Sequence, residues 1–150
     1  MYKRILHSTD GSNVSNLALR QAVMLAAAFR SELRIVTVVD TFSFDQSWWV
    51  NAGGFEEIME RMRQGANKML SDAKAEASKS GVEADTRLLD LDERGQRISD
   101  RIANEAAAWP ADLIVLGTHG RRGMDRLVLG SVAEGVARTA TAPVMLIRET

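Results

Sequence analysis

The stretch DLIVLGTHGRRGMDRLVLGSVAEGVART, residues 112–139, joins an apolar run to a glycine-rich segment and then to a helical pattern. LIVLG, at 113–117, has the branched apolar composition of a strand buried on both faces of a parallel sheet. SVAEGVARTA, at 131–140, has the composition of a short helix. A strand, a loop and a helix in this order predict a fold of the α/β class.

The same alternation runs from one end of the chain to the other. Apolar and β-branched runs predict strands at 3–9, 32–39, 82–91, 111–117 and 144–148. Helical spacing of apolar residues predicts helices at 14–28, 55–80, 97–109 and 131–140. Each crossover is long enough to hold a helix and to join parallel strands. We therefore expect a three-layer α/β sandwich in a single domain covering residues 1–150.

The composition is that of an ordinary soluble globular domain. Nineteen basic residues nearly balance twenty acidic residues, so no overall field draws the protein to nucleic acid or to an anionic membrane. The chain has no cysteine, which excludes disulfides, thiolate catalysis and Cys-ligated metals. The longest apolar run, residues 22–29, is too short to cross a bilayer, and the N-terminus turns polar too early for a signal peptide. We expect a cytoplasmic protein without a nucleic acid partner or membrane insertion.

The glycines of the segment 117–131 indicate an anion-binding site. Gly117 ends the predicted strand, Gly130 precedes the predicted helix, and two glycines between them permit positive φ. Backbone N–H groups without Cβ atoms nearby can converge at a helix N-terminus, where the dipole favours negative charge. Ser131 can cap this helix or donate its hydroxyl to a phosphate oxygen. Positive charge in the same loop comes from Arg121, Arg122 and Arg126.

An alternative is that these glycines only make turns and that the arginines are solvated. The spacing discriminates, because GTHGRRG lacks the G-x-G-x-x-G pattern of dinucleotide-binding folds and the chain has no G-x-x-x-x-G-K-[ST] loop. The spacing present is G-x2-G-x9-G-S, formed by Gly117, Gly120, Gly130 and Ser131. This motif resembles the nucleotide-binding motif of the universal stress protein family. The resemblance covers the whole chain through TDGS (9–12), VVD (38–40), ADLIVLGTHG (111–120) and APVMLIR (142–148).

The resemblance implies a five-stranded parallel sheet of order 3-2-1-4-5, with ATP bound between the first and fourth strands. Thr9 and Asp10 are then expected near adenine and ribose, and Val38 is expected to supply a backbone contact to adenine. The residues expected around the ribose and phosphates are Leu116, Gly117, His119, Gly120, Arg121, Gly130, Ser131, Val132 and Ala133.

Three features depart from the family pattern. Ser8, which we still assign to the site, stands where proline is frequent. Ala133 stands where some ATP-binding relatives have threonine, so one hydroxyl contact is absent. The third strand runs into LDLDERGQRI (89–98) instead of a glycine-then-proline turn. These changes leave nucleotide preference open.

Titratable residues near the predicted site have competing interpretations. His119 is assigned to hydrogen bonding of ribose or phosphate, not to catalysis, and His7 to packing within its strand. Asp10 is assigned to a ribose hydroxyl or, through water, to Mg²⁺ on the phosphates, with helix capping as the alternative. Asp40 is assigned to structure or to the rim. Three acidic residues are predicted to be solvated, without a metal site: Asp90, Asp92 and Glu93.

Two segments suggest contacts with other molecules. Residues 41–54 contain two phenylalanines and two tryptophans, which is unusual for a connection. We expect this segment to contact a partner surface, with covering of bound nucleotide as the alternative. The last strand, 144–148, is apolar and lies at an edge of the expected sheet, so it can pair with another copy. A homodimer is expected.

Together these features predict an ATP-binding, cytoplasmic stress-response protein whose nucleotide changes its conformation or partner choice. No residue is a convincing candidate for activating a water molecule, so a dedicated enzyme is not expected, although slow ATP hydrolysis stays open. One alternative is a nucleotide-dependent enzyme of the same α/β class, a weak ATPase or nucleotidyl transferase, but the SGGxDS signature of the latter is missing. The other is an interaction module without nucleotide, which the intact glycine pattern disfavours.

Overall fold

The computed structural model describes residues 1–43, 54–119 and 129–149, and within them a five-stranded parallel sheet. The strands are β1 (Arg4–Ser8), β2 (Glu32–Val39), β3 (Ala84–Asp90), β4 (Leu113–Gly117) and β5 (Val144–Ile147). Their order is β3-β2-β1-β4-β5, and every neighbouring pair is parallel. The predicted fold class and strand order are therefore confirmed, with strand ends that differ from the predicted ones by a few residues.

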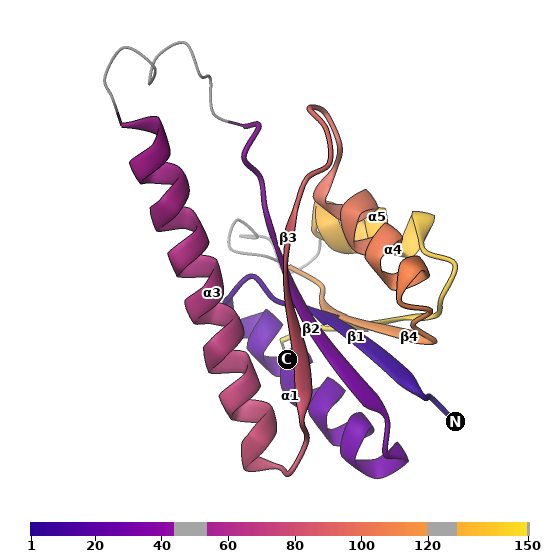
Figure 1. Cartoon of the computed structure of the whole chain (residues 1–150). Helices are drawn as coiled ribbons and strands as arrows, with labels where there is room; N and C mark the ends of the chain where they lie inside the picture. Colours follow the sequence, from indigo (N-terminus) through magenta and orange to yellow (C-terminus); the bar gives the residue numbers. More distant parts are fainter. Residues whose placement is uncertain (44–53, 120–128, 150) are drawn as a thin grey trace.

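Helices cover both faces of this sheet (Figure 1). They are α1 (Asn13–Phe29), α3 (Phe55–Lys79), α4 (Ile98–Ala108) and α5 (Ser131–Thr139). One apolar core joins the sheet to α1 and α3, and a second joins it to α4 and α5. The chain thus forms the three layers expected from its alternating pattern, and the carboxyl ends of all five strands point to the same edge.

The central strand β1 shows how one strand serves both cores. Ile5 and Leu6 are both fully buried, but Ile5 belongs to the α1 and α3 core and Leu6 to the α4 and α5 core. Successive side chains of a strand point to opposite faces, so both must be apolar in a covered sheet. Truncating such a residue to alanine typically costs about 2–5 kcal/mol, so this run anchors the middle layer.

The helix ends follow local sequence signals. Ser12 is the N-cap of α1, and its side chain accepts a hydrogen bond from the Ser15 backbone N–H. Gly81, at φ 72°, takes the left-handed conformation just after α3. Such a conformation is easiest for glycine, which explains why the helix ends there.

Two glycines allow close contacts between elements. A Cβ placed on Gly117, at the end of β4, would lie 2.9 Å from Val14 Cγ1 and 3.1 Å from the Ser15 backbone nitrogen. A Cβ on Gly135 in α5 would lie 2.3 Å from Ser99 Oγ in α4. Real Cβ atoms do not approach neighbours this closely, so both positions require the absence of a side chain. Gly117 brings the start of α1 onto β4, and Gly135 brings α5 onto α4.

The apolar stripe of α3 is only partly core. Ala66, Leu70, Ala73 and Ala77 are buried, whereas Ile58, Met62 and Met69 are half-buried. The N-terminal half of the stripe is therefore only partly in the core. None of residues 55–65 is fully buried, and these turns of α3 border a cleft described below.

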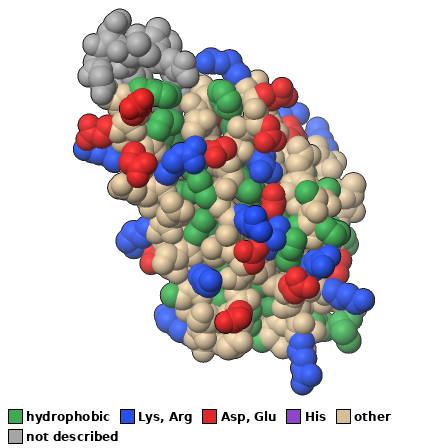
Figure 2. Space-filling view, viewed as in Figure 1, with side chains coloured by type: hydrophobic (Ala, Val, Ile, Leu, Met, Phe, Trp, Pro, Cys, Tyr) green, Lys and Arg blue, Asp and Glu red, His purple; other side chains and the backbone are tan. Residues whose placement is uncertain are grey.

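The surface carries charges of both signs. Lys and Arg side chains are interspersed with Asp and Glu over the face shown in Figure 2. Across the described residues, none of the helices is both long and apolar enough to cross a membrane.

Candidate functional site

An open cleft of about 900 Å³ lies at the carboxyl ends of the strands. Its floor is made by the ends of β1, β2 and β4, and its sides by α3 and by the first turns of α4 and α5. Strand order reverses here, because β1 lies between β2 and β4. In open α/β sheets, ligands bind at such a switch point, so the cleft is the candidate functional site; we call it the strand-end cleft.

The strand-end cleft brings together most of the residues assigned from the sequence. Those that line it are Ser8, Thr9, Asp10, Val38, Leu116, Gly117, His119, Gly130, Ser131, Val132 and Ala133. They come from four separate parts of the chain, which the topology gathers at one edge. Gly120 and Arg121, as well as Arg122, Gly123 and Arg126, lie outside the described residues.

On one side of the cleft, the N-terminus of α1 is closed by its own side chains. Ser12 Oγ accepts from Ser15 N at 3.2 Å, and Asp10 Oδ1 accepts from Ser12 N at 2.9 Å. Ser15 Oγ donates to Thr9 Oγ1 at 3.1 Å, and the same oxygen of Thr9 accepts from Gly11 N at 3.2 Å. The turn from β1 into α1 therefore satisfies its donors internally and presents Thr9 and Asp10 to the cleft in fixed positions.

The N-terminus of α5 is built differently. Its N-cap is Gly130, which has no side chain to accept from the helix, so of the two roles open to Ser131, capping of α5 is wrong. The helix begins one residue earlier than that role requires, and Ser131 is instead an exposed residue of its first turn. Gly130 N donates to Thr118 O at 2.8 Å, which fixes this helix end against the end of β4.

The first turn of α5 therefore keeps its donors available. Within the part of the chain that the structure describes, no acceptor is recorded for the backbone N–H groups of Ser131, Val132 and Ala133. The first N–H groups of any helix lack partners inside the helix, and the dipole makes this end positive. An anionic group in the cleft can satisfy these donors, which makes this end suited to phosphate.

His119 supplies a further unsatisfied polar atom at the same place. Its Nδ1 lies 2.9 Å from Thr118 Oγ1, and its Nε2 is buried with no hydrogen-bond partner among the described residues. A buried polar atom without a partner costs about 1–3 kcal/mol. Because His119 lines the cleft beside Thr118, a bound ligand can provide the missing partner.

His7 is a structural residue of β1, as expected. It is fully buried, and its Nδ1 lies 2.9 Å from Val115 O on the neighbouring strand. Burial lowers the pKa of His7 from 6.5 to about 4, and the hydrogen bond to Val115 and the charge of Asp10 only partly offset this. The imidazole is therefore neutral at pH 7 and does not line the cleft.

The acidic residues near the cleft are engaged in local structure. Asp40 Oδ1 accepts from Phe42 N and Ser43 N, both at 3.0 Å, and Asp40 also bonds the Ser43 hydroxyl. This supports the assignment of Asp40 to a turn on the rim. Among the described residues, no group of three or more His, Cys, Asp or Glu side chains is arranged to hold a metal ion.

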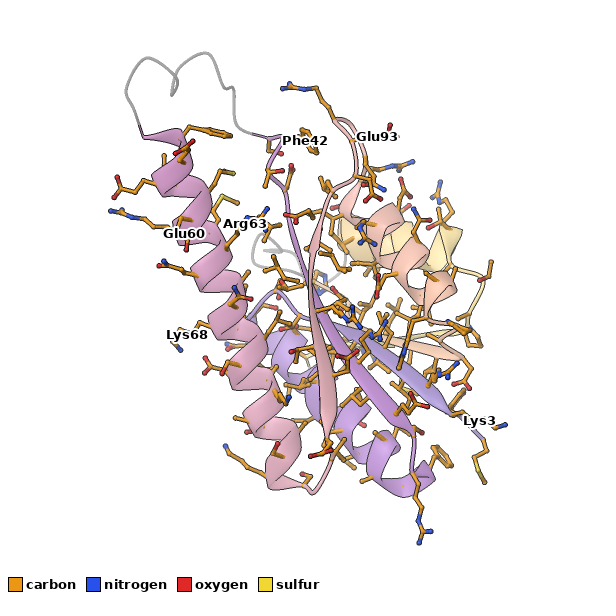
Figure 3. The ribbon with its side chains drawn as sticks, viewed as in Figure 1. Lys3, Phe42, Glu60, Arg63, Lys68 and Glu93 are labelled. Carbon is orange, nitrogen blue, oxygen red and sulfur yellow. The ribbon has the colours of Figure 1, made fainter. Side chains whose placement is uncertain are left out.

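The acidic cluster at the end of β3 is exposed to solvent to a large extent, as expected, and two of its members also form ion pairs. Arg63 on α3 makes a two-point contact with Asp90, at 2.8 and 3.2 Å. Figure 3 shows Arg63 extending from α3 toward the sheet, whereas Lys68 points away from it. Asp92 pairs with Arg101 at 3.7 Å. These contacts fasten α3 and α4 to the end of β3, beside the cleft.

The α3 side of the cleft was not assigned from the sequence. It consists of Arg61, Met62, Gly65, Ala66 and Met69. Gly65 lies inside a helix of 25 residues, where glycine costs about 0.5–1 kcal/mol relative to alanine. A glycine inside an otherwise helical pattern is a signal of packing or function, and it is the one sequence feature that can point to this wall. Of the aromatic residues in the segment 41–54, the structure describes only Phe42, because residues 44–53 lie outside the described residues.

The cleft has the chemistry of a binding site. It offers backbone donors at α5, hydroxyl groups from Thr9 and Thr37, and apolar side chains from β2, α3 and α4. A ligand with a polyanionic end and a flat, less polar end matches this arrangement.

Comparison with known proteins supports the family resemblance. A sequence profile described as the universal stress protein family matches residues 1–148. A universal stress protein of Methanocaldococcus jannaschii is 34% identical over 149 residues, covering 99% of this chain and 84% of the relative. The universal stress protein YxiE of Bacillus subtilis is 33% identical over 153 residues, covering 99% of this chain and the whole relative.

Solved structures extend this comparison. A universal stress protein family member from Burkholderia pseudomallei is 34% identical with a TM-score of 0.72, covering 97% of this chain and 96% of that one. A universal stress protein in complex with cAMP is 25% identical with a TM-score of 0.71, covering 99% of both chains. The Archaeoglobus fulgidus protein in complex with dAMP is 26% identical with a TM-score of 0.68, covering 98% of both. With a match over nearly its whole length and the corresponding fold, this chain belongs to the universal stress protein family.

Proposed function

We propose that this protein binds ATP in the strand-end cleft and acts as a nucleotide-dependent regulatory protein of the stress response. One observation carries the proposal: the uncapped N-terminus of α5 faces a cleft that also contains the unsatisfied Nε2 of His119. The helix end offers backbone donors to a ligand, and the buried Nε2 is costly unless a ligand supplies its partner. Phosphate oxygens are strong acceptors and carry the charge that a helix N-terminus favours.

The two ends of the cleft suggest the orientation of the nucleotide. The phosphates belong beside Gly130, at the available backbone N–H groups of Ser131, Val132 and Ala133. The base then lies toward β2 and α3, where Val38 and Met62 line the cleft. Asp10, on the floor between them, is assigned to the ribose or, through water, to Mg²⁺ carried by the phosphates.

Relatives support the binding of a nucleotide. Two structures of the family, at 25% and 26% identity, contain cAMP and dAMP. Both ligands are adenine nucleotides with one phosphate. We extend this to ATP because the first turn of α5 offers several donors and the glycine-rich motif continues beyond the described residues.

Regulation is favoured over catalysis. A nucleotide-hydrolysing enzyme needs a group that orients and activates water. In the described part of the cleft, Asp40 is held by a turn, and Asp10 accepts from Ser12 N. The bound nucleotide is therefore assigned to control of conformation or partner choice, and any hydrolysis is slow.

A thermal shift titration tests the proposal. At a hundred times its dissociation constant, ATP stabilises the folded protein by about 2.7 kcal/mol, which corresponds to a rise of roughly 5–10 °C in Tm. ADP and AMP are expected to give smaller shifts because they contact fewer donors. Absence of a shift with all three nucleotides contradicts the proposal and favours an interaction module.

A variant at the first turn of α5 tests the location of the phosphates. Gly130→Val places a branched side chain at the N-cap, where the phosphates approach, and is expected to abolish the ATP shift. If Gly130→Val binds ATP as wild type does, the phosphates lie elsewhere in the molecule.

We extend the proposal to a cytoplasmic homodimer that forms through β5. Within the described residues β5 pairs only with β4, and its four residues are half-buried, which suits an edge strand available to a second copy. Native mass spectrometry of gently purified protein measures subunit number and co-purified nucleotide together. A purely monomeric species at micromolar concentration contradicts this extension.

A further inference from the structure

We propose that Gly65 determines the size of the base that the cleft accepts: the helix surface at Gly65, between Met62 and Met69, receives the flat face of a purine. This inference rests on the proposed function, because it assigns the end of the nucleotide opposite to the phosphates. It concerns α3, which the glycine-rich motif does not include.

The fold itself does not need a glycine at position 65. An ideal Cβ built on Gly65 meets no atom within 4 Å, in contrast to Gly117 and Gly135. Its φ is not positive, since the positive-φ glycines described are Gly11, Gly81 and Gly95. Neither packing nor backbone conformation therefore explains a residue that weakens the helix.

Gly65 lies on the face of α3 that borders the strand-end cleft. Residues three, four and seven apart lie on one face of a helix, so Met62, Gly65, Ala66 and Met69 share a face. All four line the strand-end cleft. The two smallest side chains of this face lie between two methionines, which makes a shallow notch in the wall. Neighbouring Gln64 and Asn67 are exposed and do not line the cleft.

The two methionines beside Gly65 are suited to contact with an aromatic base. Methionine side chains make favourable contacts with aromatic rings, through a polarizable sulfur that adapts to the ring edge. A purine lying against the backbone at Gly65 has Met62 and Met69 at its two sides. Next to this wall, β2 contributes Thr37 and Val38, which also line the cleft. The notch is at the opposite side of the cleft from the donors of α5, as a nucleotide requires.

The inference predicts that a side chain at position 65 blocks the base but not the phosphates. Gly65→Ala is expected to raise Tm by about 1–4 °C, because alanine is a better helix former, and to weaken ATP binding several-fold. Gly65→Leu is expected to weaken ATP binding by roughly tenfold or more, since overpacking an apolar site is unfavourable. Calorimetric titration with ATP and with inorganic tripolyphosphate measures both ends of the cleft.

The matched controls are Asn67→Ala and the second ligand. Asn67→Ala improves helix propensity on the same helix but outside the cleft, and it is expected to leave ATP affinity unchanged. Tripolyphosphate affinity is expected to be the same in wild type and Gly65→Leu, because this ligand has no base.

Three results overturn the inference, and they are distinguishable. If Gly65→Leu binds ATP as tightly as wild type does, position 65 does not contact the base. Equal losses for ATP and tripolyphosphate show a general effect on the cleft instead of contact with the base. If wild type binds no adenine nucleotide, the proposed function fails first, and the assignment of the base fails with it.

Discussion

The N-termini of α1 and α5 both border the strand-end cleft, and they are capped in opposite ways. At α1 the side chain of Ser12 accepts from Ser15 N, and Asp10 accepts from Ser12 N in turn. At α5 the cap position is Gly130, which offers no side-chain acceptor. The chain therefore supplies acceptors at the turn into α1, and leaves donors available at α5, where we propose that a ligand binds.

This difference has an energetic meaning. A serine or aspartate cap typically contributes about 1 kcal/mol relative to alanine, although glycine is only a few tenths worse than these residues. Glycine at the cap therefore costs the folded protein little while it keeps the first turn accessible. Exchanging the two kinds of cap is the most direct way to test the comparison.

The largest effect is expected when α5 receives a cap of its own. Gly130→Asp places a carboxylate at the N-cap, where it accepts from the first turn and repels phosphate. Loss of two charge-assisted hydrogen bonds corresponds to about 4 kcal/mol, or roughly a thousandfold weaker ATP binding. Calorimetric titration with ATP measures this loss, and urea unfolding is expected to show equal or slightly higher stability.

A neutral cap separates two effects, which are competition for the backbone donors of α5 and repulsion of phosphate by a negative charge. Gly130→Ser supplies the same acceptor as Ser12 without a negative charge, and its loss of affinity is expected to lie between wild type and Gly130→Asp. Unchanged ATP binding in Gly130→Asp contradicts the assignment of the donors of α5 to phosphate.

The next largest effect concerns β1, the strand that leads into the N-terminus of α1. Because the pKa of His7 is about 4 in the folded protein and 6.5 without burial, the unfolded chain takes up the proton first as the pH falls. Stability from the neutral imidazole is complete above pH 6.5 and is lost progressively down to pH 4. The loss amounts to about 3 kcal/mol. Urea unfolding at pH 7, 6 and 5 measures it.

His7→Gln is the control for this pH dependence, because glutamine keeps a hydrogen-bond donor for Val115 O but does not titrate. Between pH 6.5 and 5, most carboxylates stay ionised, so the slope of wild type in this window is expected to disappear in the variant. Identical slopes in the two proteins contradict the assignment of the titration to His7.

The smallest effect is expected when the N-terminus of α1 loses its cap. Ser12→Ala removes the acceptor of Ser15 N and is expected to lower the free energy of unfolding by about 1 kcal/mol, or Tm by roughly 2–4 °C. ATP affinity is expected to stay within a factor of two, since the ligand does not use these donors. A large loss of ATP binding in Ser12→Ala means that the two helix ends are not independent.

The fold could be predicted from the sequence because its signals are local. β2 is a continuous β-branched run, and its burial on both faces follows from parallel pairing with β1 and β3. Gly81 and the Trp109-Pro110 pair mark the ends of α3 and α4 within a residue or two.

The candidate site was only partly predictable. Strand ends and glycine spacing identified the floor and the α5 end, but Met62 and Met69 continue the apolar stripe of α3 without interruption, so spacing alone cannot separate cleft from core. The pairing of Asp90 with Arg63 joins residues 27 positions apart and depends on how α3 lies on β3. α5 begins at Ser131 as predicted, and its C-terminal end differs from the prediction by one residue, the usual uncertainty of a helix boundary.

The contact between Gly135 and Ser99 has a consequence for the divergence of related sequences. Since these two positions share a space too small for one extra carbon, they are expected to vary as a pair, with a larger residue at one compensated by glycine or a helix displacement at the other. Substitutions at this contact are thereby restricted, because a tilt of α5 changes the direction of its first turn. Neither of the two residues lines the cleft. The orientation of the first turn of α5 therefore depends in part on a hydrogen atom in place of a side chain at Gly135, which is half-buried.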